Sequence, residues 1–271
     1  MTDAVKPDNN RYRALVEHIF FDPAFGAYAP GMTEIAFERE DLERAAEALG
    51  VKLPKNLGDV LYSIRYRMPL PDRILATQPA GQEWIVEGAG RARYRFILVT
   101  INRIVPNRDL ITIKIPDATP EIIGSYTLND EQALLAKVRY NRLIDTFLGL
   151  TAYSLQNHLR TTVKGVGQIE IDEVYVGVDR HGVQYVVPVQ AKGGSDQLSV
   201  VQAKQDIACC AEKFPGLVCR SISAQFMDDD RIAIFELTVQ DDQVRIVEER
   251  HYKLVTGTVP AEDLTLYRRT T

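Results

Sequence analysis

The chain has 271 residues, of which 45% are hydrophobic and 25% are charged. These values are typical of soluble globular proteins, and the length suits one large domain or two ordinary ones. The apolar runs fall short of the roughly 20 residues that a membrane-spanning helix needs, and the polar N-terminus lacks the apolar region of a secretory signal. We therefore expect a cytoplasmic protein with no membrane partner.

The net charge of −5 is unevenly distributed along the chain. Residues 1–115 contain 16 Lys and Arg against 15 Asp and Glu, whereas residues 116–271 contain 16 against 22. Within residues 65–108, eight arginines stand against three acids. The overall acidity does not exclude a nucleic-acid partner, because a divalent metal ion can neutralise carboxylates in the acidic half.

The N-terminal part shows the order helix, turn, helix and hairpin. Apolar residues recur at helical spacing, so helices are expected over 10–20, 38–49 and 53–66. Two strands, 83–86 and 91–101, flank a Gly-Ala-Gly turn and predict a hairpin. This order predicts a winged-helix-like DNA-binding domain over residues 1–115.

The second strand of this hairpin carries a row of arginines. Arg91, Arg93 and Arg95 alternate with apolar residues, so their guanidinium groups are expected on one side of the hairpin. Arg65 and Arg67 follow the helix expected before it. Such cations suit DNA phosphates, where they fix position rather than sequence, and a solvated polar face is the alternative interpretation.

Two prolines and a glycine interrupt the pattern at 115–124, so we place a linker at 116–128 and a second domain at 129–271. A long helical stretch capped by Asn129 is expected to run to about residue 159, with a kink or break at Gly149 and with His158 and Arg160 at its cation-favouring end. It is followed by strands at 168–178 and 183–191, a helix at 196–214, and strands at 217–226, 231–239 and 244–254. Strands joined by tight turns are antiparallel, so the order predicts a mixed α/β (α+β) fold rather than a doubly wound sheet.

The hairpin expected at 168–191 carries the residues that suggest chemistry. Its apolar alternation changes phase at Asp172 and Glu173, which we interpret as a β-bulge. The end of the second strand lies across from the start of the first, so Asp172 should face Gln190 and Lys192. A carboxylate suits Mg²⁺, an amide oxygen is a weaker neutral ligand, and a lysine can orient water or stabilise negative charge.

The pattern of Asp172, Gln190 and Lys192 within this order of elements resembles the PD-(D/E)xK nuclease superfamily. The nearest likeness is to Mrr-like and type II restriction endonucleases in which glutamine replaces the usual acid. The resemblance covers about residues 129–226 and implies a restriction-endonuclease-like mixed-sheet core and a Mg²⁺-dependent deoxyribonuclease. It implies that Asp172 and Gln190 bind the metal and that Lys192 assists the attacking water.

Three further acids are candidate metal ligands. The family often adds a glutamate from the preceding helix, for which Glu131 is the candidate; the alternative is an ordinary acid in a first helical turn. Glu170 and Glu173 are candidates to offset the neutral Gln190. A second Gln-Ala-Lys triplet, at 202–204, lies on an expected helix and is interpreted as structural.

We therefore expect an endonuclease of restriction or defence type that cuts duplex DNA, and a homodimer if its target is palindromic. Two alternatives remain open. One is a non-catalytic DNA-binding protein on a decayed nuclease fold, and the other is a protein-interaction module that uses a sheet edge.

Overall fold

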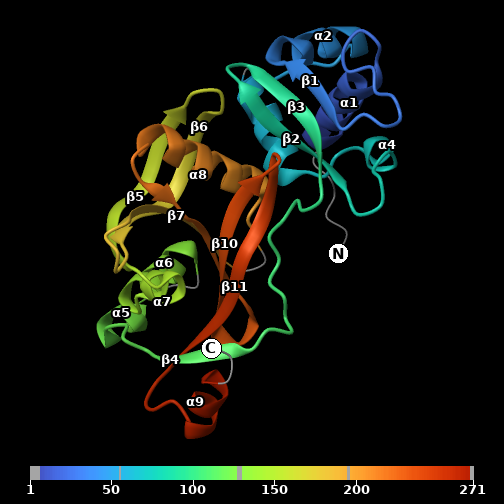
Figure 1. Cartoon of the computed structure of the whole chain (residues 1–271). Helices are drawn as coiled ribbons and strands as arrows, with labels where there is room; N and C mark the ends of the chain where they lie inside the picture. Colours follow the sequence, from blue (N-terminus) through green and yellow to red (C-terminus); the bar gives the residue numbers. More distant parts are fainter. Residues whose placement is uncertain (1–6, 55, 127–129, 194–195, 269–271) are drawn as a thin grey trace. The chain divides into compact units, whose positions relative to one another are not determined.

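The computed structural model describes residues 7–54, 56–126, 130–193 and 196–268, with the backbone alone at 7–10, 66 and 67. The chain divides into two compact units, residues 1–102 with 164–167 and residues 103–163 with 168–271 (Figure 1). The first unit thus ends before the linker expected at 116–128. Within the described ranges, no helix combines the length and the apolar character needed to cross a membrane.

The first unit packs short helices against a three-stranded antiparallel sheet of order β1-β3-β2. Its elements are α1 Pro7–Phe21, β1 Glu34–Glu38, α2 Arg39–Leu49, α3 Leu57–Tyr62, the π-helical turn η1 Ser63–Arg67, α4 Asp72–Leu75, β2 Glu83–Gly90 and β3 Arg93–Val99. The core includes Phe20, which meets the rings of Trp84 and Phe96 edge to face. The strand β1 was not expected from the sequence, because only Ile35 and Phe37 mark its buried face.

The second unit is mixed α+β, as expected, with one eight-stranded mixed sheet. The sheet order is β4-β11-β10-β9-β7-β6-β5, with the short β8 also beside β7. Its elements are β4 Thr112–Pro116, α5 Glu121–Tyr126, α6 Glu131–Tyr140, α7 Leu143–Leu148, β5 Thr151–Val163, β6 Gly167–Val178, β7 Gln184–Lys192, α8 Val200–Lys213, β8 Val218–Cys219, β9 Ser221–Phe226, η2 Asp228–Asp230, β10 Arg231–Gln240, β11 Gln243–Val255 and α9 Ala261–Tyr267. β9 runs parallel to β7, and β4 runs parallel to β11.

The long helix expected over 129–159 is wrong: the segment forms two short helices and a strand. α7 ends at Gly149, whose φ of 67° lies in the left-handed region that glycine tolerates. The residues after it form β5, which includes three Thr, one Tyr and one Val, residue types that favour strands. At the start of α6 the cap is Asp130, which accepts a hydrogen bond from the Ala133 N–H at 2.9 Å, whereas Asn129 lies outside the described residues.

Helices cover the central strands of this sheet from both faces. Val189 of β7 packs in one core cluster with Leu134 and Leu135 of α6, whereas the next residue, Gln190, contacts Asp206 of α8. Successive strand residues point to opposite faces, so α6 and α8 lie on opposite sides of β7 (Figure 1). The polar residues at the end of β7 therefore lie between two helices.

Candidate active site

The candidate site forms where β6 and β7 separate. Their pairing runs without a register shift from Val178 opposite Gln184 to Glu173 opposite Val189. Beyond this point the Asp172 Oδ2 accepts a hydrogen bond from the Ala191 N–H at 2.8 Å. This described ladder begins at Glu173, so the bulge expected at Asp172 and Glu173 stays a prediction. The phase change in the sequence coincides with the place where β6 leaves β7.

An ion pair between Lys192 and Glu131 lies beside Asp172. The Lys192 Nζ is 3.0 Å from the Glu131 Oε1, and the lysine side chain is only 13% exposed. Glu131 opens α6, where the partial positive charge of the helix N-terminus favours a carboxylate. The structure thus brings together Asp172, Lys192 and Glu131, although 61 residues separate the two members of the ion pair in sequence.

The Asp172 carboxyl is held in a partly desolvated place. Burial raises its pKa above the usual range, and the nearby Glu131 charge acts in the same direction. The Ala191 N–H and the Lys192 charge oppose this rise. A desolvated carboxylate beside a second carboxylate is electrostatically unfavourable on its own, so a bound cation would stabilise the pair.

Gln190 is buried and tied to the protein through its amide nitrogen. The Nε2 group donates to the Glu170 carbonyl oxygen at 2.9 Å and to the Asp206 Oδ1 at 3.2 Å. Burial raises the pKa of Asp206 well above the usual range, and the hydrogen bond from Gln190 opposes the rise. Asp206 was missed from the sequence. The available signal was a charged residue on the buried stripe of α8, between Ala203 and Cys210.

The two acids proposed to offset the neutral Gln190 are held by other partners. Glu173 is fully buried and lies 2.9 Å from the Arg139 Nε, with a further hydrogen bond from the Ser154 hydroxyl. Glu170 lies 3.1 Å from the Arg160 Nε, and this guanidinium is the main cause that keeps the Glu170 pKa below its usual range. These partners were hidden from the sequence because Ser154 and Arg160 lie on β5, where a helix was expected.

The donor set fits a magnesium ion better than a metal held by protein ligands alone. Asp172 and Glu131 supply carboxylates, and Gln190 retains an amide oxygen. No group of three His, Cys, Asp or Glu side chains within the described ranges is arranged to hold a metal. Mg²⁺ is commonly bound through one or two carboxylates and keeps several waters. A hollow of about 420 Å³ adjoins Glu131, the one proposed donor among its described lining residues, which are Asp130, Glu131, Gln132, Gly193 and Asp196.

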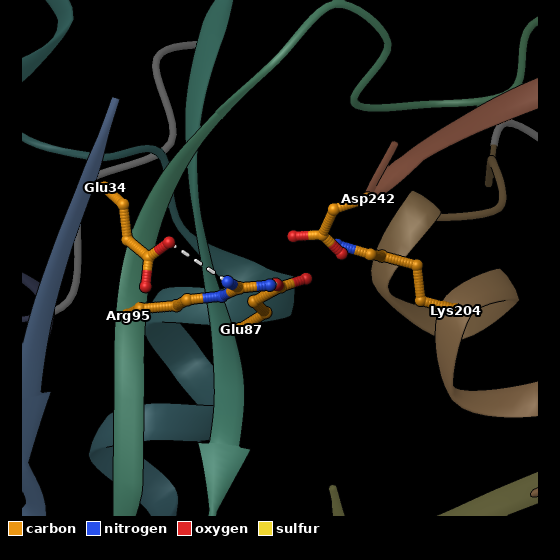
Figure 2. Close-up of polar contacts among 5 residues, drawn as sticks. All are labelled: Glu34, Glu87, Arg95, Lys204 and Asp242. Carbon is orange, nitrogen blue, oxygen red and sulfur yellow. Dashed lines mark hydrogen bonds and ion pairs between the residues drawn. The ribbon is translucent and has the colours of Figure 1, made fainter. Parts of the chain in front are cut away.

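The arginine row of the first unit is largely paired with acids. Arg95 donates from Nε to Glu87 at 2.8 Å and from Nη1 to Glu34 at 3.1 Å, and Figure 2 shows it reaching toward both carboxylates. The Arg93 Nε lies 3.5 Å from Glu38, and Arg91 is exposed at the turn between β2 and β3. Glu34 and Glu38 come from β1, the unexpected strand, which is why the sequence alone suggested a uniform cationic face.

The remaining arginine candidates lie in the turn η1. Arg65 is partly buried there, and the side chain of Arg67 lies outside the described part of the chain. In the second Gln-Ala-Lys triplet, Lys204 of α8 forms an ion pair of 2.7 Å with Asp242 (Figure 2). This contact agrees with a structural interpretation of that triplet.

Comparison with known proteins adds no relative. No protein-family model, no curated protein and no solved structure matches the chain. The residues and their geometry therefore carry the functional interpretation by themselves.

Proposed function

We propose that the chain is a divalent-metal-dependent DNA endonuclease of restriction or defence type, with Asp172, Glu131, Gln190 and Lys192 in its active site. The observation that carries this proposal is the Lys192–Glu131 ion pair beside Asp172, at the point where two strands of the central sheet separate. The lysine side chain is 13% exposed, so part of its solvation is lost in the folded chain, and that loss offsets some of the attraction to the carboxylates.

Each residue has a role suited to phosphodiester hydrolysis. Asp172 and Glu131 would hold Mg²⁺, with the amide oxygen of Gln190 as a neutral ligand. The ion, when bound, would neutralise phosphate charge and lower the pKa of a coordinated water. Lys192 would donate hydrogen bonds to the attacking water or to the developing negative charge.

The arrangement of elements supports the same proposal. The antiparallel strands β5, β6 and β7 follow α6 and α7, and α8 then leads to β9, which is parallel to β7. This extends by one strand the α-β-β-α-β order on which the resemblance to PD-(D/E)xK nucleases is based. In the first unit, the order α1, β1, α2, α3, η1, α4, β2, β3 supports a winged-helix-like DNA-binding role, with the exposed Arg91 at the tip of the hairpin.

Incubation with supercoiled plasmid tests the proposal. The wild-type protein should nick or linearise the plasmid with Mg²⁺ or Mn²⁺ and not with EDTA. Asp172→Ala and Lys192→Ala should each lower the rate by about 100-fold or more while DNA binding persists. Lys204→Ala is the matched control, because it alters the other Gln-Ala-Lys triplet and should leave cleavage intact.

Two results would contradict the proposal. Wild-type rates in both active-site variants would show that these residues do not carry the chemistry. Salt-sensitive DNA binding without cleavage under any metal would favour the non-catalytic alternative.

A further inference from the structure

The amide group of Gln190 has a determined orientation. An amide nitrogen carries two N–H donors, and both are used, one by the Glu170 carbonyl oxygen and one by the Asp206 Oδ1. A backbone carbonyl can only accept, so the nitrogen rather than the oxygen must lie on this side. The two hydrogen bonds described here engage the nitrogen and not the oxygen of this amide.

Asp206 contacts the Gln190 amide from the side of the sheet that α8 covers. It is 1% exposed and lies on the buried stripe of α8. Its Oδ1 accepts from Gln190, and its Oδ2 is buried without a hydrogen-bond partner within the described part of the chain. A buried carboxyl with one oxygen unsatisfied is destabilising, so its presence here requires a reason other than stability.

We propose that Asp206 is a positioning residue that turns the amide oxygen of Gln190 toward a divalent cation held by Asp172, an inference that rests on the proposed function. Without Asp206, one N–H of the buried amide would lack an acceptor, and the Glu170 carbonyl would be the one described contact left to hold the amide in this orientation. Partners of this kind, behind the ligands themselves, orient ligating side chains in many metal sites. Asp206 would thereby allow the neutral Gln190 to serve as a metal ligand. Glu170 and Glu173, the two acids expected to offset its lack of charge, are instead paired with arginines.

Divalent-metal affinity measured by calorimetry with Mn²⁺ on the full chain tests this role. Asp206→Leu removes the acceptor at similar size and should weaken Mn²⁺ binding by about 10- to 100-fold. Asp206→Asn keeps an acceptor oxygen and should bind close to wild type. Glu236→Gln is the matched control: it weakens another buried ion pair, with Arg220, and should leave Mn²⁺ affinity unchanged.

The metal-free protein supplies a second, independent measurement. In nuclear magnetic resonance spectra, the side-chain N–H₂ protons of Gln190 should exchange with water much more slowly than those of the exposed Gln184 on the same strand. Asp206→Leu should abolish this protection and Asp206→Asn should retain it. Fast exchange in the wild-type protein would overturn the proposal even if Asp206→Leu did not fold.

The outcomes separate this inference from the proposed function. If the wild-type protein binds Mn²⁺ and folded Asp206→Leu binds it equally tightly, Asp206 has no positioning role and the nuclease proposal stands. If the wild-type protein binds no divalent metal, both are wrong.

Discussion

Replacing Arg139 with methionine should strongly destabilise the second unit. Arg139 of α6 is the cation that neutralises Glu173, which is 0% exposed, with 2.9 Å between the Nε and the Oε1. Methionine keeps much of the apolar stem but removes the charge. A buried carboxylate would then lack its cation, with the Ser154 hydroxyl as its remaining donor among those described above.

The magnitude follows from the different exposures of the two partners. Removing one member of a buried ion pair costs about 3–5 kcal/mol. The Arg139 side chain is 38% exposed, so water can partly reach the gap, and we expect about 3 kcal/mol, at the lower end of that range. Glu173→Leu should cost less, because the orphaned Arg139 can turn toward water whereas the orphaned Glu173 cannot.

Urea denaturation followed by circular dichroism measures these differences. The double variant Arg139→Met/Glu173→Leu should recover most of the loss, because no uncompensated charge remains. The reasoning is refuted if Arg139→Met costs less than about 1 kcal/mol, the value of an exposed pair. It is also refuted if the double variant is no more stable than Arg139→Met alone.

Three further predictions concern the site, the corrected strand and the arginine row. Burial raises the pKa of Asp172, so its carboxyl group binds a proton more tightly in the folded chain than in the unfolded chain. The stability of the folded chain therefore falls as pH rises through the folded-state pKa. In EDTA, Asp172→Asn should therefore melt higher than wild type at pH 8, with the difference vanishing near pH 4; a pH-independent difference would contradict this. Gly177→Ala should cost about 1–3 kcal/mol of stability, because the Cβ of the new alanine would lie 2.8 Å from the Thr151 carbonyl oxygen. Gly124→Ala is the control and should be tolerated, because its Cβ would meet no atom within 4 Å. Equal stabilities of the two variants in urea would argue against the placement of β5 beside β6. Arg91→Ala should weaken binding to duplex DNA and lower the slope of log K against log salt by about 1. Arg95→Ala should chiefly lower stability, because it removes the guanidinium that lies 2.8 Å from the buried Glu87 carboxylate; the reverse pattern in binding titrations would contradict the observed pairing.

Periodic patterns predicted much of the local structure. The strands β6 and β7, the helices α2 and α8 and the three C-terminal strands form close to where they were expected. The two helices each bury one stripe, and β7 and β10 are apolar segments that are buried on both faces of the sheet. The segment of β5 failed because its side chains are exposed on both faces along most of its length. A segment without a buried face has no regular spacing of apolar residues, so its sequence indicates neither a helix nor a strand.

The residues of the candidate site also fall into those that the sequence predicted and those that it did not. Asp172, Gln190 and Lys192 were found because a hairpin relates residues whose separation along the chain is fixed by the turn. Glu131 was a weak candidate, and Asp206 was missed, because they reach the site from helices on opposite sides of β7. No short-range pattern encodes such contacts.

The sequence by itself determined which segments alternate or repeat with a helical period, and hence the hairpin that carries Asp172 and Lys192. Only the tertiary structure decided which charges meet. It pairs Glu170 and Glu173 with arginines, leaves Glu131 with Lys192, and puts Asp206 behind Gln190. The physical reason is that periodicity reflects burial of one face, whereas the partners of a buried charge are chosen by packing between elements distant in the chain.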